Sequence, residues 1–389
     1  MHQLGRVLIR SDLNVPTIGG KVLDKFRIKK ALEHHKDIEQ ISESVTYISH
    51  LGRPKIKDVT SKDNFSLEPI ALEMTNILNK KVDFIPYIPN VSTEKIELEH
   101  NTVVGPGIYL FENLRFYEGE IANDMIFAEK LTRGFDTYIL DAFGASHRRH
   151  ASIVSMGEYL TTYQGPLMTK EINELNKILN NTNDGYTILL GGSKISDKLD
   201  LIENLLPKVV NLLIGGGMCF TFLKALNYEI GNSLCEEDFV ERAKQLLDSK
   251  DGSKIVLPVD FGVALSLEDG ERVEVKLNNF QKDHIGIDIG KETVQKFRNI
   301  LYNSKTVFWN GPMGIFEEER FSFGTKETVE IVSNLDAYTI VGGGDSVSAI
   351  NKYSNLEKFS HVSTGGGASL EYLEGKQLPG VNKYPPLII

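Results

Sequence analysis

Short apolar runs that are typical of strands recur along the chain, and most are followed by a helical pattern. They are RVLIRSD, VTYISH, GIYLFENLRF and DTYILDAFG in the first half, and YTILLGG, NLLIGGG, KIVLPVD, TVFWNGPMG, YTIVGGG and HVSTGGG in the second. Nearly continuous apolar runs suit strands that are buried on both faces of a parallel sheet. Strands that alternate with helices predict βαβ units and therefore an α/β fold.

Two of the helical patterns bear on the organisation of the chain. Segment 66–78 predicts a helix with Ser66 as its N-cap. Segment 165–185 predicts one helix that ends in an Asn/Gly loop, because apolar side chains recur in it at helical spacing: Met168, Ile172, Leu175 and Leu179. We interpret 165–185 as the connector between two α/β domains, 1–164 and 186–372.

Length and composition restrict the class of protein. A chain of 389 residues with 41% hydrophobic residues can form two or three domains with large cores. No apolar run approaches the ~18 residues that a membrane span needs. Cys219 and Cys235 cannot form a disulfide framework, and a net charge of -10 argues against general nucleic-acid binding. We therefore expect a cytoplasmic protein with reduced thiols and with neither a membrane nor a nucleic-acid partner.

Basic and polar side chains follow several predicted strands of the first half. The segment DAFGASHRRHAS has four basic side chains in a row, His147 to His150, and an isolated run of this kind is usually a solvated loop. Others follow further strands or begin the next helix: Asp12, Asn14, Arg27, His50, Arg53 and Arg115. Ligands of open α/β sheets bind beyond the carboxyl ends of the strands, and arginine binds phosphate or carboxylate oxygens through paired donors. The joint pattern predicts a site for a small, highly anionic ligand, although any one of these residues alone could form a surface salt bridge.

Glycines follow the predicted strands of the second half, at Gly191–Gly192, Gly215–Gly217, Gly342–Gly344 and Gly365–Gly367. Glycine lets backbone N–H groups approach an anion at a helix N-terminus. Tight turns explain a single run equally well, but repetition at the same place in the fold favours a nucleotide-phosphate site. Asp345 and Ser346 add the hard oxygen ligands that Mg²⁺ prefers.

The segment GGSKISDK adds two lysines to these glycines. If Ser196 caps the helix that follows, Lys198 lies in its first turn, where the helix dipole opposes a cation and a bound anion would favour it. A solvated lysine that tolerates the small penalty is the alternative. The segment GIDIGKE does not complete a P-loop, and no dinucleotide fingerprint is present. Trp309 is predicted to lie in the core. These features together favour a two-substrate phosphoryl-transfer enzyme that closes about a hinge.

Long segments of the chain, in order, resemble the phosphoglycerate kinase family. They are RSDLNVP, SHLGRPK, LFENLRF, DAFGASHRRHAS, LGGSKISDK, LLIGGGMCFTFLKA, WNGPMGIFE, IVGGGDSVSA and STGGGASLEYLEGKQLPGV. The resemblance implies a monomer of two Rossmann-like domains, each a mainly parallel sheet flanked by helices, joined by a hinge helix. It implies reversible phosphoryl transfer between 1,3-bisphosphoglycerate and Mg-ADP, giving 3-phosphoglycerate and ATP. Domain 1–164 would hold the phosphoglycerate, domain 186–372 the nucleotide, and the tail 373–389 would return to the first domain.

The resemblance also implies roles for individual residues. Those implied in phosphoglycerate binding are Asp12, Leu13, Asn14, Arg27, His50, Leu51, Gly52, Arg53, Arg115 and Arg148. Those implied in nucleotide binding are Lys198, Gly215, Gly216, Gly286, Asn310, Glu317, Gly343, Gly344, Asp345 and Ser346, with Asp345 as the Mg²⁺ ligand. Arg27, Lys194, Lys198 and Gly366 would be catalytic.

The substrate carboxylate is already ionised at pH 7, so the implied reaction needs no general base and relies on positioning and charge neutralisation. Ser11, Leu13, Ser193, Ser346 and Arg149 depart from the usual family residues, and none of these changes removes a presumed catalytic group. Two alternatives remain. A nucleotide-dependent oxidoreductase would have a complete dinucleotide fingerprint. A non-catalytic relative would have lost Arg27, Lys194 or Asp345.

Overall fold

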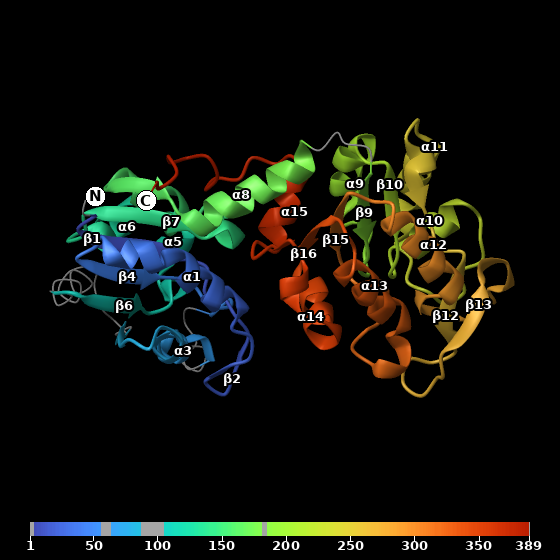
Figure 1. Ribbon diagram of the computed structural model, residues 1–389, viewed down its shortest axis with the longest axis horizontal. Helices are drawn as coiled ribbons and strands as arrows, with labels where there is room; N and C mark the ends of the chain where they lie inside the picture. Colours follow the sequence, from blue (N-terminus) through green and yellow to red (C-terminus); the bar gives the residue numbers. More distant parts are fainter. Residues whose placement is uncertain (1–3, 56–63, 87–104, 181–184, 389) are drawn as a thin grey trace. The chain divides into compact units, whose positions relative to one another are not determined.

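The computed structural model describes residues 4–55, 64–86, 105–180 and 185–388. The chain divides into two compact units (Figure 1). Unit 1 comprises Met1–Asn173 and Gln377–Ile389, and unit 2 comprises Glu174–Lys376. Among the described residues, no helix is both long enough and apolar enough to cross a membrane.

Unit 1 is built on a six-stranded sheet in the order β5-β6-β4-β1-β7-β8, and every pairing in it is parallel. Its strands are β1 Arg6–Ser11, β4 Ser44–Ile48, β5 Val82–Ile85, β6 Gly107–Phe111, β7 Thr137–Asp141 and β8 Thr161–Gln164. A short antiparallel pair, β2 Thr17–Ile18 and β3 Lys21–Val22, follows β1. The strands β1, β4 and β7 are buried along almost their whole length, as the apolar runs predict.

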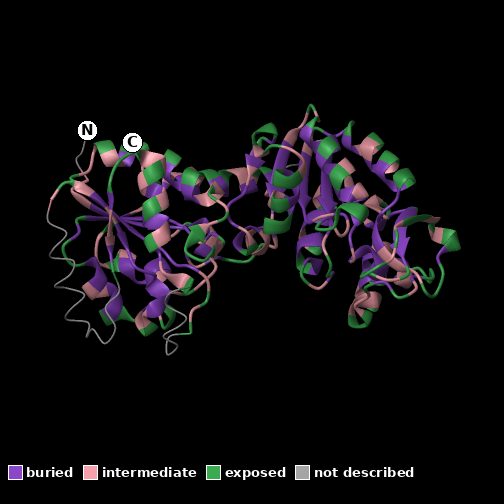
Figure 2. Ribbon diagram, turned by 90° about the horizontal axis from the view of Figure 1, so that it is seen from below, coloured by how far each residue is buried: buried purple, intermediate pink, exposed green. Residues whose placement is uncertain are grey.

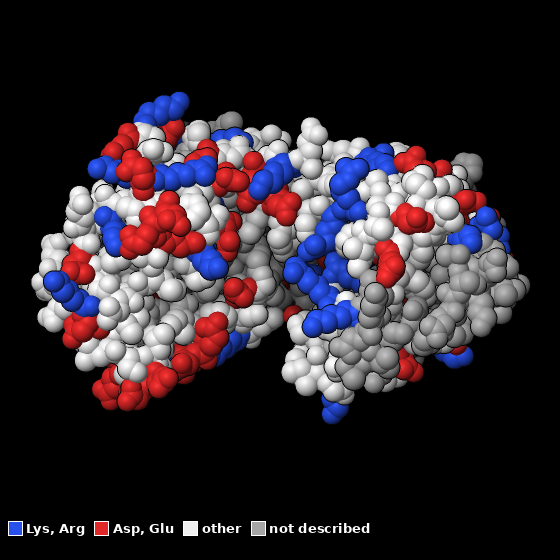
Figure 3. Space-filling model, turned by 180° about the vertical axis from the view of Figure 1, so that it is seen from behind, with Lys and Arg blue, Asp and Glu red and all other residues white. Residues whose placement is uncertain are grey.

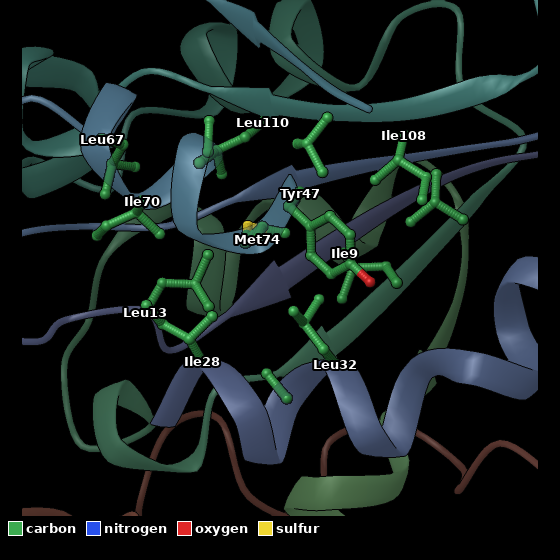
Figure 4. Close-up of a cluster of buried hydrophobic side chains, with 14 of the residues drawn as sticks. Ile9, Leu13, Ile28, Leu32, Tyr47, Leu67, Ile70, Met74, Ile108 and Leu110 are labelled. Carbon is green, nitrogen blue, oxygen red and sulfur yellow. The ribbon is translucent and has the colours of Figure 1, made fainter. Parts of the chain in front are cut away.

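The helices of unit 1 pack against its sheet and form a hydrophobic core with it. They are α1 Phe26–Gln40, α3 Glu68–Leu78, α5 Glu118–Ile121, α6 Met125–Thr132 and α7 Ala151–Val154, with 3-10 turns at η1 Leu114–Phe116, η2 Phe143–Ala145 and η3 Met156–Glu158. Figure 4 shows Ile28 and Leu32 of α1 directed towards the sheet that carries Ile9 and Tyr47, and Ile70 of α3 lies in the same cluster. Large apolar side chains at these positions hold α1, and therefore Arg27 in its first turn, against the strands.

Two local predictions for unit 1 were wrong. The run GIYLFENLRF is a strand only as far as Phe111, and its second half forms η1. Helix α3 begins at Glu68 rather than after Ser66, although the Ser66 hydroxyl accepts a hydrogen bond of 3.2 Å from the N–H of Glu68. The Ser66 hydroxyl is also bound to Glu112 at 2.7 Å, and this tertiary partner is invisible in the local pattern.

Unit 2 repeats the parallel arrangement, with a sheet in the order β11-β10-β9-β15-β16-β17. Its strands are β9 Tyr186–Leu190, β10 Asn211–Ile214, β11 Ile255–Val256, β15 Thr306–Asn310, β16 Tyr338–Gly342 and β17 His361–Val362. Figure 2 shows these central strands as buried and the helices around them with exposed outer faces. Trp309 is fully buried in the core of this unit, as predicted.

Unit 2 also contains a second sheet that the sequence patterns do not predict. It is antiparallel, in the order β13-β12-β14, with β12 Asp260–Ala264, β13 Val273–Lys276 and β14 Ile285–Ile289. The helices of the unit are α9 Leu199–Leu205, α10 Cys219–Ala225, α11 Val240–Asp248, α12 Lys291–Leu301, α13 Phe323–Ser333, α14 Gly344–Tyr353 and α15 Gly367–Leu373. Short 3-10 turns lie at η4 Leu206–Lys208, η5 Glu237–Phe239, η6 Gly252–Lys254, η7 Leu277–Asn279, η8 Glu319–Phe321 and η9 Leu356–Lys358.

The chain passes from unit 1 to unit 2 along α8, Pro166–Leu179. The predicted Asn/Gly loop after it includes residues 181–184, which lie outside the described residues. The last residues pack in unit 1: the N–H of Gln164 donates to Pro385 at 2.8 Å, and the N–H of Leu387 donates back to Gln164 at 2.9 Å. The two units therefore share one connector helix, and unit 1 contains both chain ends.

Candidate active site

The carboxyl ends of β1 and β4 bring together the first set of predicted site residues. Asp12 Oδ2 and Arg27 Nη1 form an ion pair at 3.1 Å, and the same Nη1 donates to the carbonyl of Asn14 at 3.2 Å. Asn14 Oδ1 in turn accepts the N–H of Gly52 at 2.9 Å. Arg27, at the start of α1, is thereby held beside the two segments that leave the strands.

Arg115 and Gly52 continue this arrangement. Arg115 lies in η1, directly after β6, and its Nη1 donates to the carbonyl of Gly52. Gly52 has a φ of +56°, which disfavours any other residue. Leu13 and Leu51 are buried, so their side chains serve packing. Arg53 is exposed, and among the described residues the structure gives it no hydrogen bond or ion pair.

Arg10 is a buried cation that the sequence interpretation missed. It lies in β1 with only 1% of its surface exposed, and its Nη2 is 2.9 Å from His50 Nδ1. Its Nε donates to the Ser152 hydroxyl at 3.0 Å, which donates to the fully buried Glu120 at 2.6 Å. Burial raises the pKa of Glu120, and the nearby Arg10 charge opposes this rise. The only signal in the sequence is an arginine that follows four apolar residues within a strand.

The arginines around His50 and His150 lower the pKa of both histidines. Burial, followed by the charges of Arg10, Arg115 and Arg27, holds the pKa of His50 well below its usual 6.5. Burial, followed by the charge of Arg115, lowers the pKa of His150 to about 4. We name this set the basic cluster: Arg10, Arg27, His50, Arg115, Arg148 and His150. At pH 7 both histidines of the basic cluster are therefore neutral.

The remaining residues of the HRRH run lie at different depths. Arg148 is partly buried and contributes to lowering the pKa of both Arg115 and His150, so it belongs to the basic cluster. Arg149 is exposed. Burial lowers the pKa of Arg115 to about 10, which still leaves the guanidinium charged at neutral pH. On the face drawn in Figure 3, the lysines and arginines of unit 1 form a nearly continuous column, whereas unit 2 shows acidic patches, including a long band along its lower edge, with basic side chains scattered among them.

In unit 2, Lys198 is the central cation at the carboxyl edge of the parallel sheet. Its Nζ donates to the carbonyls of Gly191 and Asn310, the latter at 3.1 Å, and only 7% of the residue is exposed. Burial lowers its pKa to about 8, and the negative charges of Asp345 and Asp197 oppose this. The prediction that Ser196 caps α9 was wrong. Lys198 itself occupies the N-cap position, and the Ser196 hydroxyl donates instead to Glu236 at 2.7 Å.

The glycines of this edge serve two different purposes. Gly191, Gly216 and Gly311 stand where an added Cβ would lie within 2.6 Å of other backbone atoms, so they allow the loops to pack closely. An added Cβ at Gly344 or Gly367 would meet nothing within 4 Å. The open positions lie in the first turns of α14 and α15, and the N-terminus of a helix suits an anion because its first N–H groups have no partner within the helix.

Asn310 and Asp345 supply polar groups at this edge. Asn310 is buried, and its Nδ2 has no hydrogen-bond partner among the residues that the structure describes. A Cβ at Gly343 would stand 2.9 Å from that nitrogen. Ser346 is buried and accepts the N–H of Gly311 at 2.7 Å, whereas Asp345 beside it is exposed. The site therefore offers an unused amide donor and one accessible carboxylate.

The donor set fits Mg²⁺ that is held mainly by a phosphate ligand. Mg²⁺ in phosphoryl-transfer sites takes one or two protein carboxylates and fills its other positions with phosphate and water oxygens. Asp345 provides one carboxylate next to the open position at Gly344. Within the described part of the chain, no group of three or more His, Cys, Asp or Glu side chains forms a metal cage. The chain alone thus offers a partial ligand set that bound phosphates would complete.

The other predicted residues lie around this edge. Gly286 is in β14, its N–H donates to the Ser233 hydroxyl at 2.8 Å, and an added Cβ would meet the Phe220 ring at 1.9 Å. Gly215 packs against Met313, where an added Cβ would lie 2.6 Å from the sulfur. The remaining three differ in their surroundings: Lys194 is exposed near Glu236, Glu317 is exposed after β15, and Gly366 precedes α15 with a φ of +55°.

Comparison with known proteins decides the family. The model of the phosphoglycerate kinase family matches residues 3–376. The chain belongs to the phosphoglycerate kinase family. It is 43% identical to the phosphoglycerate kinase of Dictyoglomus turgidum over 380 residues, covering 97% of this chain and 94% of that protein. It is 44% identical to the Thermosipho africanus enzyme, again covering 97% and 94%.

Solved structures agree with the family assignment. The phosphoglycerate kinase structure from Coxiella burnetii has a TM-score of 0.84 and 37% identity, over 97% of this chain and 96% of that one. The structure from Pyrococcus horikoshii has a TM-score of 0.83 and 29% identity, over 98% and 95%. The expectation of an α/β fold with parallel, Rossmann-like sheets flanked by helices is confirmed.

Membership of the family establishes the reaction. The protein is a phosphotransferase that moves a phosphoryl group reversibly between 1,3-bisphosphoglycerate and ADP, a step of glycolysis. Its substrates are small molecules, one of them a nucleotide. The oxidoreductase and the non-catalytic relative are not favoured.

Proposed function

We propose that unit 1 binds the phosphoglycerate through the basic cluster and that unit 2 binds Mg-ADP or Mg-ATP at the glycine-rich edge. The observation that carries this division is the contrast between the two sheet edges. In unit 1, Arg10, Arg27 and Arg115 lie within electrostatic range of His50, and Arg148 lies within range of Arg115. Unit 2 instead offers open helix N-termini, an unused amide donor and one buried lysine.

The basic cluster suits a ligand that carries several negative charges close together. The charges of Arg10, Arg27 and Arg115 lower the pKa of the neutral His50, so the cluster has a surplus of positive charge. A phosphate or carboxylate would remove this repulsion and would gain paired hydrogen bonds from the guanidinium groups. Asp12 and Asn14 hold Arg27 in place, while Arg148 and the exposed Arg53 remain available to the ligand.

Unit 2 would act on the nucleotide phosphates. Lys198 and Lys194 would neutralise charge on the transferred group, and the N–H groups around Gly343, Gly344 and Gly366 would donate to phosphate oxygens. Mg²⁺, bound with the nucleotide, would withdraw charge from the phosphate oxygens, and Asp345 would hold it. We assign Gly215, Gly216 and Gly286 to the base and Glu317 to the ribose.

The chemical step would need no proton acceptor from the chain, because the accepting carboxylate is already ionised. Transfer would occur in line when hinge closure brings the two ligands together, with Arg27 steadying the phosphoryl group. The proposal includes a monomeric, cytoplasmic enzyme without nucleic-acid or membrane partners. The net charge of -10 supports the absence of a nucleic-acid partner, since a surplus of basic side chains is what such binding needs.

Arg27→Ala tests the division between the units. We expect turnover to fall by roughly a hundredfold, while the affinity for ATP, measured by calorimetry, stays within about twofold. Lys29→Ala removes a charge from an exposed position on the same helix and should leave both quantities near those of the wild type. Weaker ATP binding in the Arg27 variant, with 3-phosphoglycerate binding unchanged, would contradict the assignment.

A further inference from the structure

Asn113 is a fully buried amide two residues after the end of β6, at the N-cap of η1 and two residues before Arg115. Its Nδ2 donates to the carbonyl of Leu51 at 2.8 Å and to the carbonyl of Phe65 at 2.9 Å. Its Oδ1 accepts the N–H of Arg115 at 3.0 Å. Both amide protons and the carbonyl oxygen therefore have partners, and these belong to three separate segments of unit 1.

Glu112 extends the same junction from the preceding position. Its Oε1 accepts the N–H of Asn113 at 2.6 Å and the N–H of Leu67 at 2.8 Å, and its Oε2 accepts the Ser66 hydroxyl at 2.7 Å. Burial raises the pKa of this carboxyl, and the hydrogen bonds from Ser66, Leu67 and Asn113 oppose the rise. The Glu112–Asn113 pair thus joins β6 to the start of α3 and to the segment after β4.

The partners of Asn113 surround Gly52 on both sides. Leu51 precedes Gly52 directly, and the Arg115 guanidinium donates to the Gly52 carbonyl. An added Cβ at Gly52 would stand 2.2 Å from Cε1 of Phe65, so the Phe65 ring lies against this glycine. The bonds of Asn113 hold the backbone of both neighbours, Leu51 and Phe65, and the backbone of Arg115.

From these contacts we infer that Asn113 is a positioning residue for the phosphoryl-transfer reaction. It holds the segment His50–Arg53 and Arg115 at the separation that a phosphate or carboxylate group of 3-phosphoglycerate requires. The inference rests on the proposed function of the basic cluster and adds to it a residue that does not touch the substrate. Only an asparagine combines two donors and one acceptor at this length, since aspartate has no amide protons.

Asn113→Ser separates the acceptor role of the side chain from its donor role. Serine at an N-cap can still accept the N–H two residues later, here that of Arg115, but it cannot donate to both Leu51 and Phe65. We expect the dissociation constant for 3-phosphoglycerate to rise about tenfold, because the buried carbonyl of Leu51 and the partly buried carbonyl of Phe65 lose their donor and the segment moves. The dissociation constant for ATP should stay within about twofold.

The matched control is Asp124→Ala, which removes the N-cap of α6 in the same unit, where Asp124 Oδ1 accepts the N–H of Phe127 at 2.6 Å. It should lower the unfolding temperature without changing the affinity for 3-phosphoglycerate. A purely structural Asn113 would make the serine variant behave in the same way, and that outcome overturns the inference. An equal loss of affinity for both substrates also overturns it.

Arg115→Ala distinguishes this inference from the proposed function. If Arg115→Ala leaves 3-phosphoglycerate binding intact, the assignment of the basic cluster itself fails. If it weakens binding and Asn113→Ser does not, only the positioning role fails. Should the serine variant not fold, Asn113→Asp, which has the same shape and keeps the acceptor, replaces it. The same selective loss is expected, and an unchanged affinity for 3-phosphoglycerate refutes the role.

Discussion

Replacing Lys198 with methionine should make the free protein more stable at neutral pH while removing most of its activity. Burial lowers the pKa of Lys198 from 10.5 to about 8. That difference corresponds to about 3 kcal/mol of destabilisation from a charged Lys198 in the folded protein at pH 7. Methionine removes the charge and also two hydrogen bonds to the carbonyls of Gly191 and Asn310, each worth about 1 kcal/mol. The expected net gain is therefore about 1 kcal/mol.

The sign of the pH dependence follows from the direction of the shift. Because the folded-state pKa is lower than that of the unfolded chain, the unfolded chain binds more protons between about pH 8 and 10.5. The penalty from Lys198 is present in full below pH 8, and the wild type regains stability as the pH rises towards 10.5. Relative to the methionine variant, the wild type should gain about 2 kcal/mol between pH 7 and 9.5, so the order of stability reverses.

Denaturant unfolding of the ligand-free proteins at pH 7 and 9.5 measures this difference. Lys194→Met is the control, because it makes the same substitution at an exposed position four residues earlier. Turnover of the Lys198 variant should fall by roughly a hundredfold or more. A stability difference from wild type that does not change between the two pH values would refute the argument that Lys198 is held charged against its burial.

Three further outcomes are expected. Burial and the charge of Arg115 lower the pKa of His150 to about 4, so the wild type should lose stability as the pH falls from 6.5 towards 4. At pH 5, thermal unfolding should show that His150→Gln has lost roughly 1 kcal/mol less stability than the wild type. Equal losses in the two proteins would contradict this. Burial raises the pKa of Asp288 to about 8. Between pH 6 and 9, denaturant unfolding should therefore show the wild type losing about 3 kcal/mol of unfolding free energy relative to Asp288→Asn. If the two proteins show the same dependence of stability on pH, Asp288 is not neutral in the folded protein. Gly52→Ala forces a Cβ into the Phe65 ring at a residue whose φ is +56°. Calorimetry should show about tenfold weaker 3-phosphoglycerate binding and normal ATP binding. An unchanged affinity for 3-phosphoglycerate would count against the role of Gly52.

The main strands could be predicted from the sequence because they are buried on both faces. The strands β1, β4, β7 and β9 consist of short, nearly continuous apolar runs, which are typical of strands covered on both faces. The strand β13 escaped prediction because it is largely exposed and half of its residues are charged, so it has no apolar run. Its pairing with β12 is a tertiary fact that local patterns do not contain.

The errors at the site have the same origin. Ser196 looks like an N-cap in the local sequence, but Glu236, forty residues later, binds its hydroxyl and the helix begins at Leu199 instead. Arg10 was missed because a charge within a strand is usually solvated, whereas here His50 and Ser152 enclose it. Residue type identifies candidates at strand ends, but the partner that satisfies each buried group comes from another segment.

The two proposed binding sites meet negative charge by different means. In unit 1, mutually repelling cations are kept close by a buried framework that includes Glu120, so the folding energy of the unit maintains a surplus of positive charge. In unit 2, open backbone N–H groups carry only partial charges, and the single buried lysine loses affinity for its proton. A ligand that neutralises either set would remove an existing penalty in addition to forming its own contacts. The free protein is therefore less stable than it could be at both sites, and ligand binding relieves that penalty. Substitutions that stabilise the free protein at the basic cluster or at Lys198 should for this reason impair catalysis.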